Sequence, residues 1–188
     1  MNEIRKARVG LLGLMFDLYD AWPELRSAMA EFGERLVNVM APFAEVEFPG
    51  VCNNREQVER VVAGFEANGK DLIVVVLLTY APSHIALPAL LATRLPILIF
   101  NTQQLFEVSQ ETQGSDTTRN HGMHGVQDLA NVLLRAGRPF HIVTGHYQDA
   151  RALAEVKGWC DAARTAKYPV SAASSPRRRP PSAKTSRH

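Results

Sequence analysis

Uninterrupted apolar runs are the feature that most limits how this chain can fold. Residues 71–78 read Asp-Leu-Ile-Val-Val-Val-Leu-Leu, and the apolar positions do not alternate with polar ones. Strands of this kind are buried on both faces, as in a parallel sheet that helices cover on each side. Four further short apolar runs are predicted strands, at residues 8–15, 45–48, 96–100 and 140–144. The sequence therefore predicts a sheet of five parallel strands.

Helical patterns lie between these runs. Residues 22–40 place apolar side chains three and four positions apart, which is typical of a helix with one buried face. The start of a second helix is predicted from a capping box, formed either by Asn53 with Glu56 or by Asn54 with Gln57.

Three more helices follow in the pattern. We expect Ser83 to cap a short helix that Pro88 shortens or bends. Residues 126–136 and 148–165 are the last two predicted helices. Strands that alternate with helices indicate repeated βαβ units, so the fold class is α/β. We expect a doubly wound, flavodoxin-like three-layer sandwich with the strand order 2-1-3-4-5.

The composition changes after residue 166. Residues 167–188 hold six of the 21 basic residues and none of the 19 acidic ones, so residues 1–166 carry 15 basic against 19 acidic side chains. This end is rich in Ser, Pro and Arg and is expected to be a disordered tail behind one folded domain of residues 1–166. Its three adjacent arginines, residues 177–179, would bind nucleic acid only weakly and without specificity. We expect no specific nucleic-acid partner.

Cysteine content and hydropathy indicate a cytoplasmic protein. Cys52 and Cys160 are too few for a disulfide framework. The longest aliphatic run has seven residues, against about 20 for a membrane span. The apolar start of the chain is interrupted by Asp17 and Asp20, so we interpret it as a strand and not as a signal peptide.

Several common chemistries lack their motif. Gly10 and Gly13 give G-x-x-G where dinucleotide binding needs G-x-G-x-x-G, and the sequence has no P-loop. It also has no G-x-S-x-G, C-x-x-C or H-E-x-x-H. These absences disfavour dehydrogenase, P-loop NTPase, hydrolase and zinc-protease functions.

Ligands of open parallel sheets bind beyond the carboxyl ends of the strands. This rule selects residues 16–19, 52–54, 79–80, 101–103 and 145–149. The connection at 104–124 is longer than a compact domain needs and contains histidines.

The histidines allow more than one interpretation. His121 and His124 form H-x-x-H, a spacing that places two imidazoles on one helical face. The pair could bind a metal, contact a substrate through one ring, or be solvated in a loop. His146 is open in the same way between ligand contact and hydrogen bonding at a strand end. His84 and His141 are assigned to surface or packing.

The segment from His124 to Asp149 resembles the amino-terminal domain of the L-arabinose isomerases, within the broader L-fucose/L-arabinose isomerase group. Residues 144–149 read TGHYQD where that family has a T-G-H-W-Q-D-like motif, and His124 stands at the matching distance. Asp17-Leu18-Tyr19 is similar to the family's H-L-Y turn, and Asn101-Thr102-Gln103 to its H-T-Q strand end. The resemblance covers roughly residues 8–165.

The resemblance implies an aldose–ketose isomerase that uses Mn²⁺ and a glutamate pair, with the metal ligands and both glutamates in later domains. It implies no catalytic residue and no metal ligand in this chain, and a homo-oligomer in which this domain covers a neighbouring subunit's active site. By the same resemblance, Phe16, Leu18, Tyr19 and Tyr80 would line the sugar pocket, and His124 would hydrogen-bond a sugar hydroxyl.

Family members continue into a second α/β domain where this chain has its basic tail. We therefore expect an isomerase truncated near residue 166 that lacks the metal site and is catalytically incomplete alone. The alternative is a stand-alone, non-enzymatic module that binds a sugar or another metabolite at the same strand ends.

Overall fold

The sheet has the predicted strand order. The computed structural model describes residues 5–107, 109–112 and 114–167. Its parallel sheet runs β2-β1-β4-β5-β6, which is the order 2-1-3-4-5 of the five predicted strands. The strands are β1 (Ala7–Leu14), β2 (Ala44–Glu47), β4 (Leu72–Leu77), β5 (Ile97–Asn101) and β6 (His141–Thr144). The doubly wound α/β fold is therefore confirmed.

A sixth strand, β3 (Val51–Cys52), was not predicted. It has two residues and pairs with the end of β1, with Gly13 opposite Val51 and Leu14 opposite Cys52. A strand this short leaves no pattern in the sequence. Its pairing with β1 depends on the path that the chain takes after β2.

The central strand β4 is buried over its whole length, as its unbroken apolar run requires. It pairs with β1 from Val9–Leu72 to Leu14–Leu77 and with β5 on its other side. Its side chains alternate between two core clusters, with Val74 and Val76 in one and Ile73 and Val75 in the other. This one strand therefore supplies both faces of the core.

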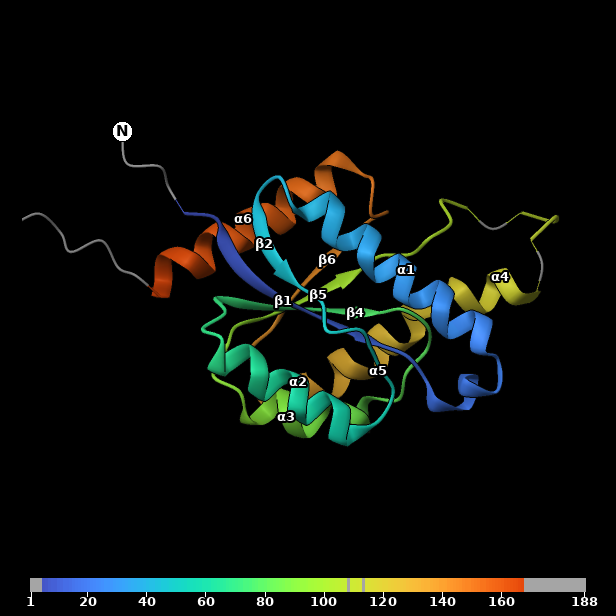
Figure 1. Ribbon diagram of the computed structural model, residues 1–188, viewed down its shortest axis with the longest axis horizontal. Helices are drawn as coiled ribbons and strands as arrows, with labels where there is room; N and C mark the ends of the chain where they lie inside the picture. The colour runs from blue at the N-terminus through green and yellow to red at the C-terminus, as the bar shows by residue number, and fades with distance from the viewer. Residues whose placement is uncertain (1–4, 108, 113, 168–188) are drawn as a thin grey trace, which may run out of the picture.

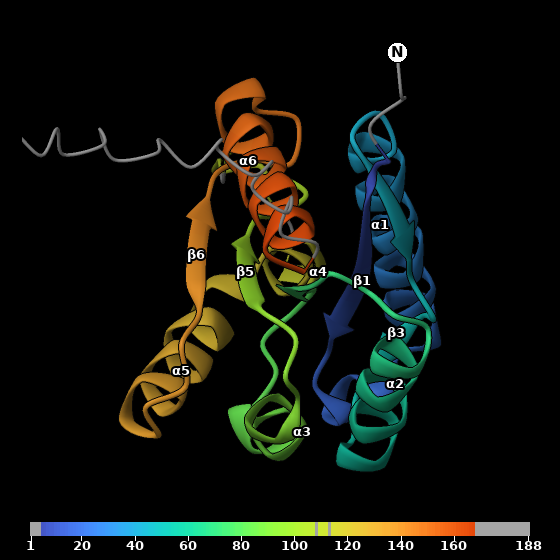
Figure 2. The same ribbon diagram turned by 90° about the vertical axis from the view of Figure 1, so that its left-hand side faces the viewer.

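Helices cover the two faces of the sheet (Figures 1 and 2). One face is packed by α1 (Pro23–Met40) and α6 (Ala150–Lys167), the other by α2 (Arg55–Ala67), α3 (Leu87–Ala92) and α5 (Gly122–Arg135). The start of β1 and the end of α6 lie on the left of Figure 1, opposite α4 (Gly114–Arg119). The carboxyl ends of the strands point toward the side that carries α4.

The helix starts follow local hydrogen bonding. Of the two capping boxes considered, the one with Asn54 and Gln57 forms, since the Asn54 side chain accepts the Gln57 amide at 3.0 Å. The Gln57 side chain reaches back to the amide of Asn53, also at 3.0 Å. The second helix is therefore fixed at its start by two bonds, which join Gln57 to Asn54 and to Asn53.

The expectation for Ser83 is wrong. Ser83 begins a short 3₁₀ turn, η2 (Ser83–Ile85), and α3 begins later, at Leu87, without a side-chain cap. Pro88 lies in the first turn of α3, where a missing N–H costs little, so it neither shortens nor bends the helix. The Ser83 amide instead donates to the Asp128 carboxylate at 2.8 Å, which ties η2 to α5.

Two further predictions have different bounds in the structure. The helix expected at 126–136 begins four residues earlier, so His124 lies within α5 and His121 at its start, and neither sits in an irregular loop. The last helix begins at Ala150 and extends to Lys167. Apart from Lys167, the expected disordered tail of residues 167–188 lies outside the described residues.

The thiols of Cys52 and Cys160 are buried, and neither forms a disulfide. Burial raises the pKa of the Cys52 thiol to about 11 and that of the Cys160 thiol to about 12. Both groups are therefore neutral apolar packing elements at physiological pH. In the described part of the chain, no helix combines the length and apolar character that crossing a bilayer requires.

Candidate functional site

The ends of β1 and β4 are joined by a hydrogen bond that brings two aromatic residues together. The Phe16 amide follows β1 and donates to Thr79 Oγ1 at 3.4 Å, and the Thr79 hydroxyl donates to the Tyr80 carbonyl at 2.8 Å. Thr79 is fully buried, so this link lies beneath the surface of the carboxyl edge. It places the Phe16 and Tyr80 rings edge to face, with centroids 5.7 Å apart.

Six rings form a continuous row across this edge, which we call the aromatic row. Neighbouring centroids are 5.8 Å apart for Trp22–Tyr19, 5.8 Å for Tyr19–Phe16, 5.7 Å for Phe16–Tyr80, 6.4 Å for Tyr80–His121 and 4.4 Å for His121–His124. The rings come from the loop after β1, η1 (Asp17–Ala21), the start of α1, the loop after β4, and α5. Segments far apart in the sequence therefore present one aromatic surface.

The row contains four of the five residues that the sequence singled out. Phe16, Tyr19 and Tyr80 are in ring contact, and His124 joins them through His121. Leu18 lies on η1 beside the row with 62% of its surface exposed. Its role, like that of the other four, stays a prediction.

Sequence reasoning did not assign Trp22 to the site. It was used only to mark the start of a helix, yet its indole packs against Tyr19 three residues earlier. The signal was the i, i+3 spacing, which aligns two side chains in a 3₁₀ turn. His121 was considered only as half of a histidine pair.

The phenols in the row are suited to donating hydrogen bonds. Partial burial raises the pKa of the Tyr19 phenol, and the neighbouring Tyr80 phenol raises it further. Tyr19 therefore keeps its proton at neutral pH. A neutral phenol can donate to, and accept from, a ligand hydroxyl.

The position of the two histidines depends on a close approach of α5 to β4. A Cβ at Gly122 would lie 2.1 Å from the Leu77 carbonyl oxygen, so only glycine fits there. Among residues 5–107, 109–112 and 114–167, no three His, Cys, Asp or Glu side chains are grouped so that they could hold a metal ion. The two rings therefore have no third ligand of these types within the described structure.

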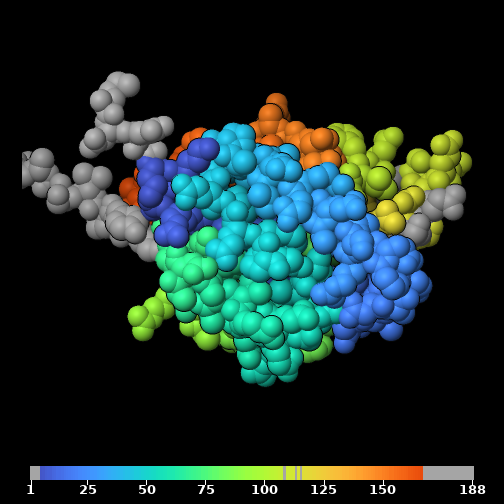
Figure 3. Space-filling model, viewed as in Figure 1, coloured from blue at the N-terminus to red at the C-terminus, as the bar shows by residue number. Residues whose placement is uncertain are grey.

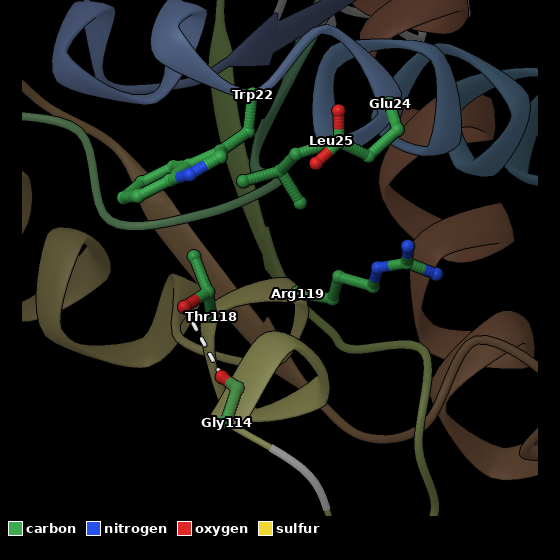
Figure 4. Close-up of a pocket in the computed structure, with 6 residues that line it drawn as sticks. All are labelled: Trp22, Glu24, Leu25, Gly114, Thr118 and Arg119. Carbon is green, nitrogen blue, oxygen red and sulfur yellow. Dashed lines mark hydrogen bonds between the residues drawn. The ribbon is translucent and has the colours of Figure 1, made fainter.

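A cavity of about 420 Å³ borders the row at Trp22. It is lined by Trp22, Glu24 and Leu25 on one side and by Gly114, Thr118 and Arg119 on the other, so it separates the start of α1 from α4 (Figure 4). The Trp22 indole faces Thr118, and Glu24 and Arg119 lie toward the other end. Figure 3 shows the same neighbourhood on the surface, with the yellow-green atoms around α4 next to the blue atoms at the start of α1.

This cavity contains a cation with unused hydrogen-bonding capacity. Arg119 Nε is buried and has no hydrogen-bond partner in the described part of the chain. A buried donor without a partner is costly, and a small movement of the Arg119 side chain would let a ligand oxygen become its partner. Together, the row and this cavity offer apolar ring faces, phenol and imidazole groups and one guanidinium.

His146 is held by hydrogen bonds at the strand end, as the second of its two interpretations predicts. Its Nδ1 accepts the Gln148 amide at 3.3 Å, so this nitrogen carries no proton. Its Nε2 is therefore the protonated nitrogen and donates to the Gln104 carbonyl oxygen, 3.2 Å away. Both ring nitrogens are occupied within the chain. His84 is exposed, and His141 stacks on Trp159 with centroids 3.6 Å apart, as surface and packing roles predict.

Comparison with known proteins identifies the family and covers the part of the candidate site that begins at Trp22. The family model for the L-arabinose isomerase N-terminal domain matches residues 22–169. The L-arabinose isomerase of Bifidobacterium animalis subsp. lactis is 34% identical over 85 residues, which are 45% of this chain and 17% of that enzyme.

Two other relatives have the same name. The L-arabinose isomerase of Acidothermus cellulolyticus is 30% identical over 102 residues, covering 52% of this chain and 20% of the relative. That of Erwinia tasmaniensis is 29% identical over 82 residues, covering 43% and 16%. The aligned parts therefore make up at most about a fifth of these enzymes.

Proposed function

Because this chain belongs to the L-arabinose isomerase N-terminal domain family, we propose that it supplies a sugar-binding edge to an aldose–ketose isomerase that acts on L-arabinose. The aromatic row is the observation that carries this proposal. Its rings lie where ligands of parallel α/β sheets bind, and its phenol and imidazole groups can form hydrogen bonds with a ligand.

The chemistry of the row matches a sugar. A pentose has C–H groups that pack on aromatic faces and hydroxyls that both donate and accept hydrogen bonds. Phe16 and Tyr80 meet edge to face and offer apolar ring surface. The Tyr19 phenol and the exposed His124 imidazole offer hydrogen bonds. We assign Phe16, Leu18, Tyr19 and Tyr80 to the wall of the pocket and His124 to a sugar hydroxyl.

Isomerisation of an aldose moves a proton between adjacent carbons and needs a polarised carbonyl oxygen. The described residues do not group three side chains that could bind a metal ion, and we assign no chemical step to them. We assign this chain the binding and orientation of the sugar. We propose that Mn²⁺ and the carboxylates that move the proton belong to other parts of the enzyme.

The carboxyl edge also has the character of a subunit contact. Leu18, Trp22, Phe106 and Met123 are large apolar side chains exposed on loops and helix starts at this edge. A cluster of exposed apolar side chains is typical of an interaction surface. We propose that another copy of the protein packs here in a homo-oligomer, and covers the bound sugar.

Calorimetry with two histidine variants tests the proposed function. We expect the 188-residue chain to bind L-arabinose and His124→Ala to weaken the binding about fivefold, because one hydrogen bond contributes about 1 kcal/mol. The matched control is His84→Ala, an exposed histidine on η2 that should leave the dissociation constant unchanged. Equal affinity of His124→Ala and wild type would contradict the role of His124, and no binding by the wild type would contradict the proposed function.

A further inference from the structure

A second cavity lies at the ends of β5 and β6, and none of the six rings of the aromatic row lines it. Its volume is about 300 Å³, at the lower end of the range for small-molecule pockets. Nine residues line it: Asn101, Thr102, Gln103, Phe106, Met123, Thr144, Gly145, His146 and Asp149. None of them belongs to the row, and only Met123 comes from α5.

Internal hydrogen bonds hold the floor of this cavity in place. Asn101 Nδ2 donates to Thr144 Oγ1 at 3.3 Å, across the paired ends of β5 and β6. This bond leaves the Asn101 side-chain carbonyl as an acceptor and the Thr144 hydroxyl proton as a donor. Both groups belong to the cavity lining.

Asp149 is oriented in the same way. Its Oδ1 accepts the Arg151 amide at 2.9 Å and so caps the start of α6. The cap fixes the carboxylate at the cavity, and the second oxygen remains able to accept. The His146 ring beside it is fixed through both nitrogens, so it contributes a rigid wall.

Thr102 lines the cavity and has a buried hydroxyl group whose hydrogen-bonding capacity is unused among the described residues. It is 5% exposed, and its hydroxyl has no hydrogen-bond partner in the part of the chain that the structure describes. Buried hydroxyls without a partner are uncommon and destabilising. Its oxygen has almost no accessible surface, so the side chain must rotate slightly toward the cavity before the hydroxyl of an occupant can become its partner.

One wall of the cavity is apolar and reaches into solvent. Phe106 is 80% exposed, and its ring stands edge-on to the His146 ring with centroids 5.3 Å apart. An exposed aromatic ring next to fixed polar groups matches a ligand with a C–H face and several hydroxyls.

From these contacts we infer that the β5–β6 cavity is a second binding site, and that it takes a small, neutral, polyhydroxylated molecule. Its lining mixes donors from Thr102, Thr144 and Gln103 with acceptors from Asn101 and Asp149. The Asp149 carboxylate disfavours phosphates and carboxylates. No residue of the row lines this site, so the inference does not rest on the sugar site proposed at the row. Phe106 and Met123 are shared with the proposed subunit contact.

The test is a titration of the full 188-residue chain with L-arabinose, followed by the NMR signals of backbone amides. We expect saturable shifts at Thr144 and Gly145, which report on the cavity, separately from shifts at Tyr80 and His121, which report on the row. Asp149→Asn should weaken the cavity response about fivefold while keeping the helix cap, since asparagine caps as well as aspartate. Glu155→Gln, which removes an exposed carboxylate from the same helix, is the matched control and should change nothing at the cavity.

The outcomes test the cavity and the row separately. Shifts at the row alone would overturn this inference and leave the proposed function standing. Shifts at the cavity alone would support the inference and contradict the sugar site at the row. The absence of shifts at the cavity, or equal affinities of Asp149→Asn and wild type there, would overturn it. L-arabinonate, an anion of similar size, should not bind at the cavity, and binding as tight as that of L-arabinose would refute the preference for neutral ligands.

Discussion

Gly122→Ala should lower the free energy of unfolding by about 1–3 kcal/mol and should also weaken L-arabinose binding. The added Cβ would lie 2.1 Å from the Leu77 carbonyl oxygen, which is backbone and cannot turn away as a side chain can. The start of α5 must therefore move off β4. Because His121 and His124 flank this position, their rings would move away from Tyr80.

Chemical denaturation and calorimetry measure the two effects of Gly122→Ala. The matched control is Gly64→Ala, since a Cβ at Gly64 in α2 meets nothing within 4 Å. Alanine stabilises a helix by up to about 1 kcal/mol relative to glycine, so this control should be neutral or stabilising and should bind sugar normally. A Gly122→Ala protein as stable as wild type would mean that α5 does not approach β4 this closely.

Leu36→Ala should lower the free energy of unfolding by about 2–5 kcal/mol, through lost apolar burial and the cavity left behind. Leu36 is fully buried in the core between α1 and the sheet. This loss is a large share of the 5–15 kcal/mol typical of a domain. The same substitution at Leu134, which is 72% exposed on α5, should stay within about 0.5 kcal/mol.

Urea denaturation measures both leucine variants on one scale. A lower midpoint with an unchanged slope for Leu36→Ala is the expected result, because the slope follows the surface exposed on unfolding. If the two variants lost equal stability, the assignment of Leu36 to the core and Leu134 to the surface would be wrong.

The strand order could be predicted because burial leaves a direct mark on composition. A strand such as β4, covered on both faces, must be apolar at every position, and five short apolar runs separated by helices allow few topologies. β3 could not be predicted in this way, since two residues leave no pattern. The early start of α5 was missed because it depends on a backbone contact between Gly122 and Leu77, which are far apart in the sequence.

The candidate site was predicted in part for a similar reason. The rule that ligands bind at strand ends selected the segments 16–19 and 79–80, and the resemblance to the family assigned Phe16, Tyr19 and Tyr80 within them. Their contact with one another depends on the Thr79 hydroxyl, which links the ends of two strands across 63 residues. Helix and strand periodicity carries no information about such a link, and the same holds for the contact between Tyr80 and His121.

The central claim is that L-arabinose binds at the aromatic row, and the two tryptophans allow a direct test. Trp22 belongs to the row, whereas Trp159 stacks on His141 at the start of β6, away from the carboxyl edge. Titration of Trp159→Phe with L-arabinose leaves Trp22 as the sole indole and should give a saturable change in fluorescence. The reciprocal Trp22→Phe protein should give none. A Trp22 emission that does not respond to L-arabinose, or an equal response from Trp159, would contradict the claim.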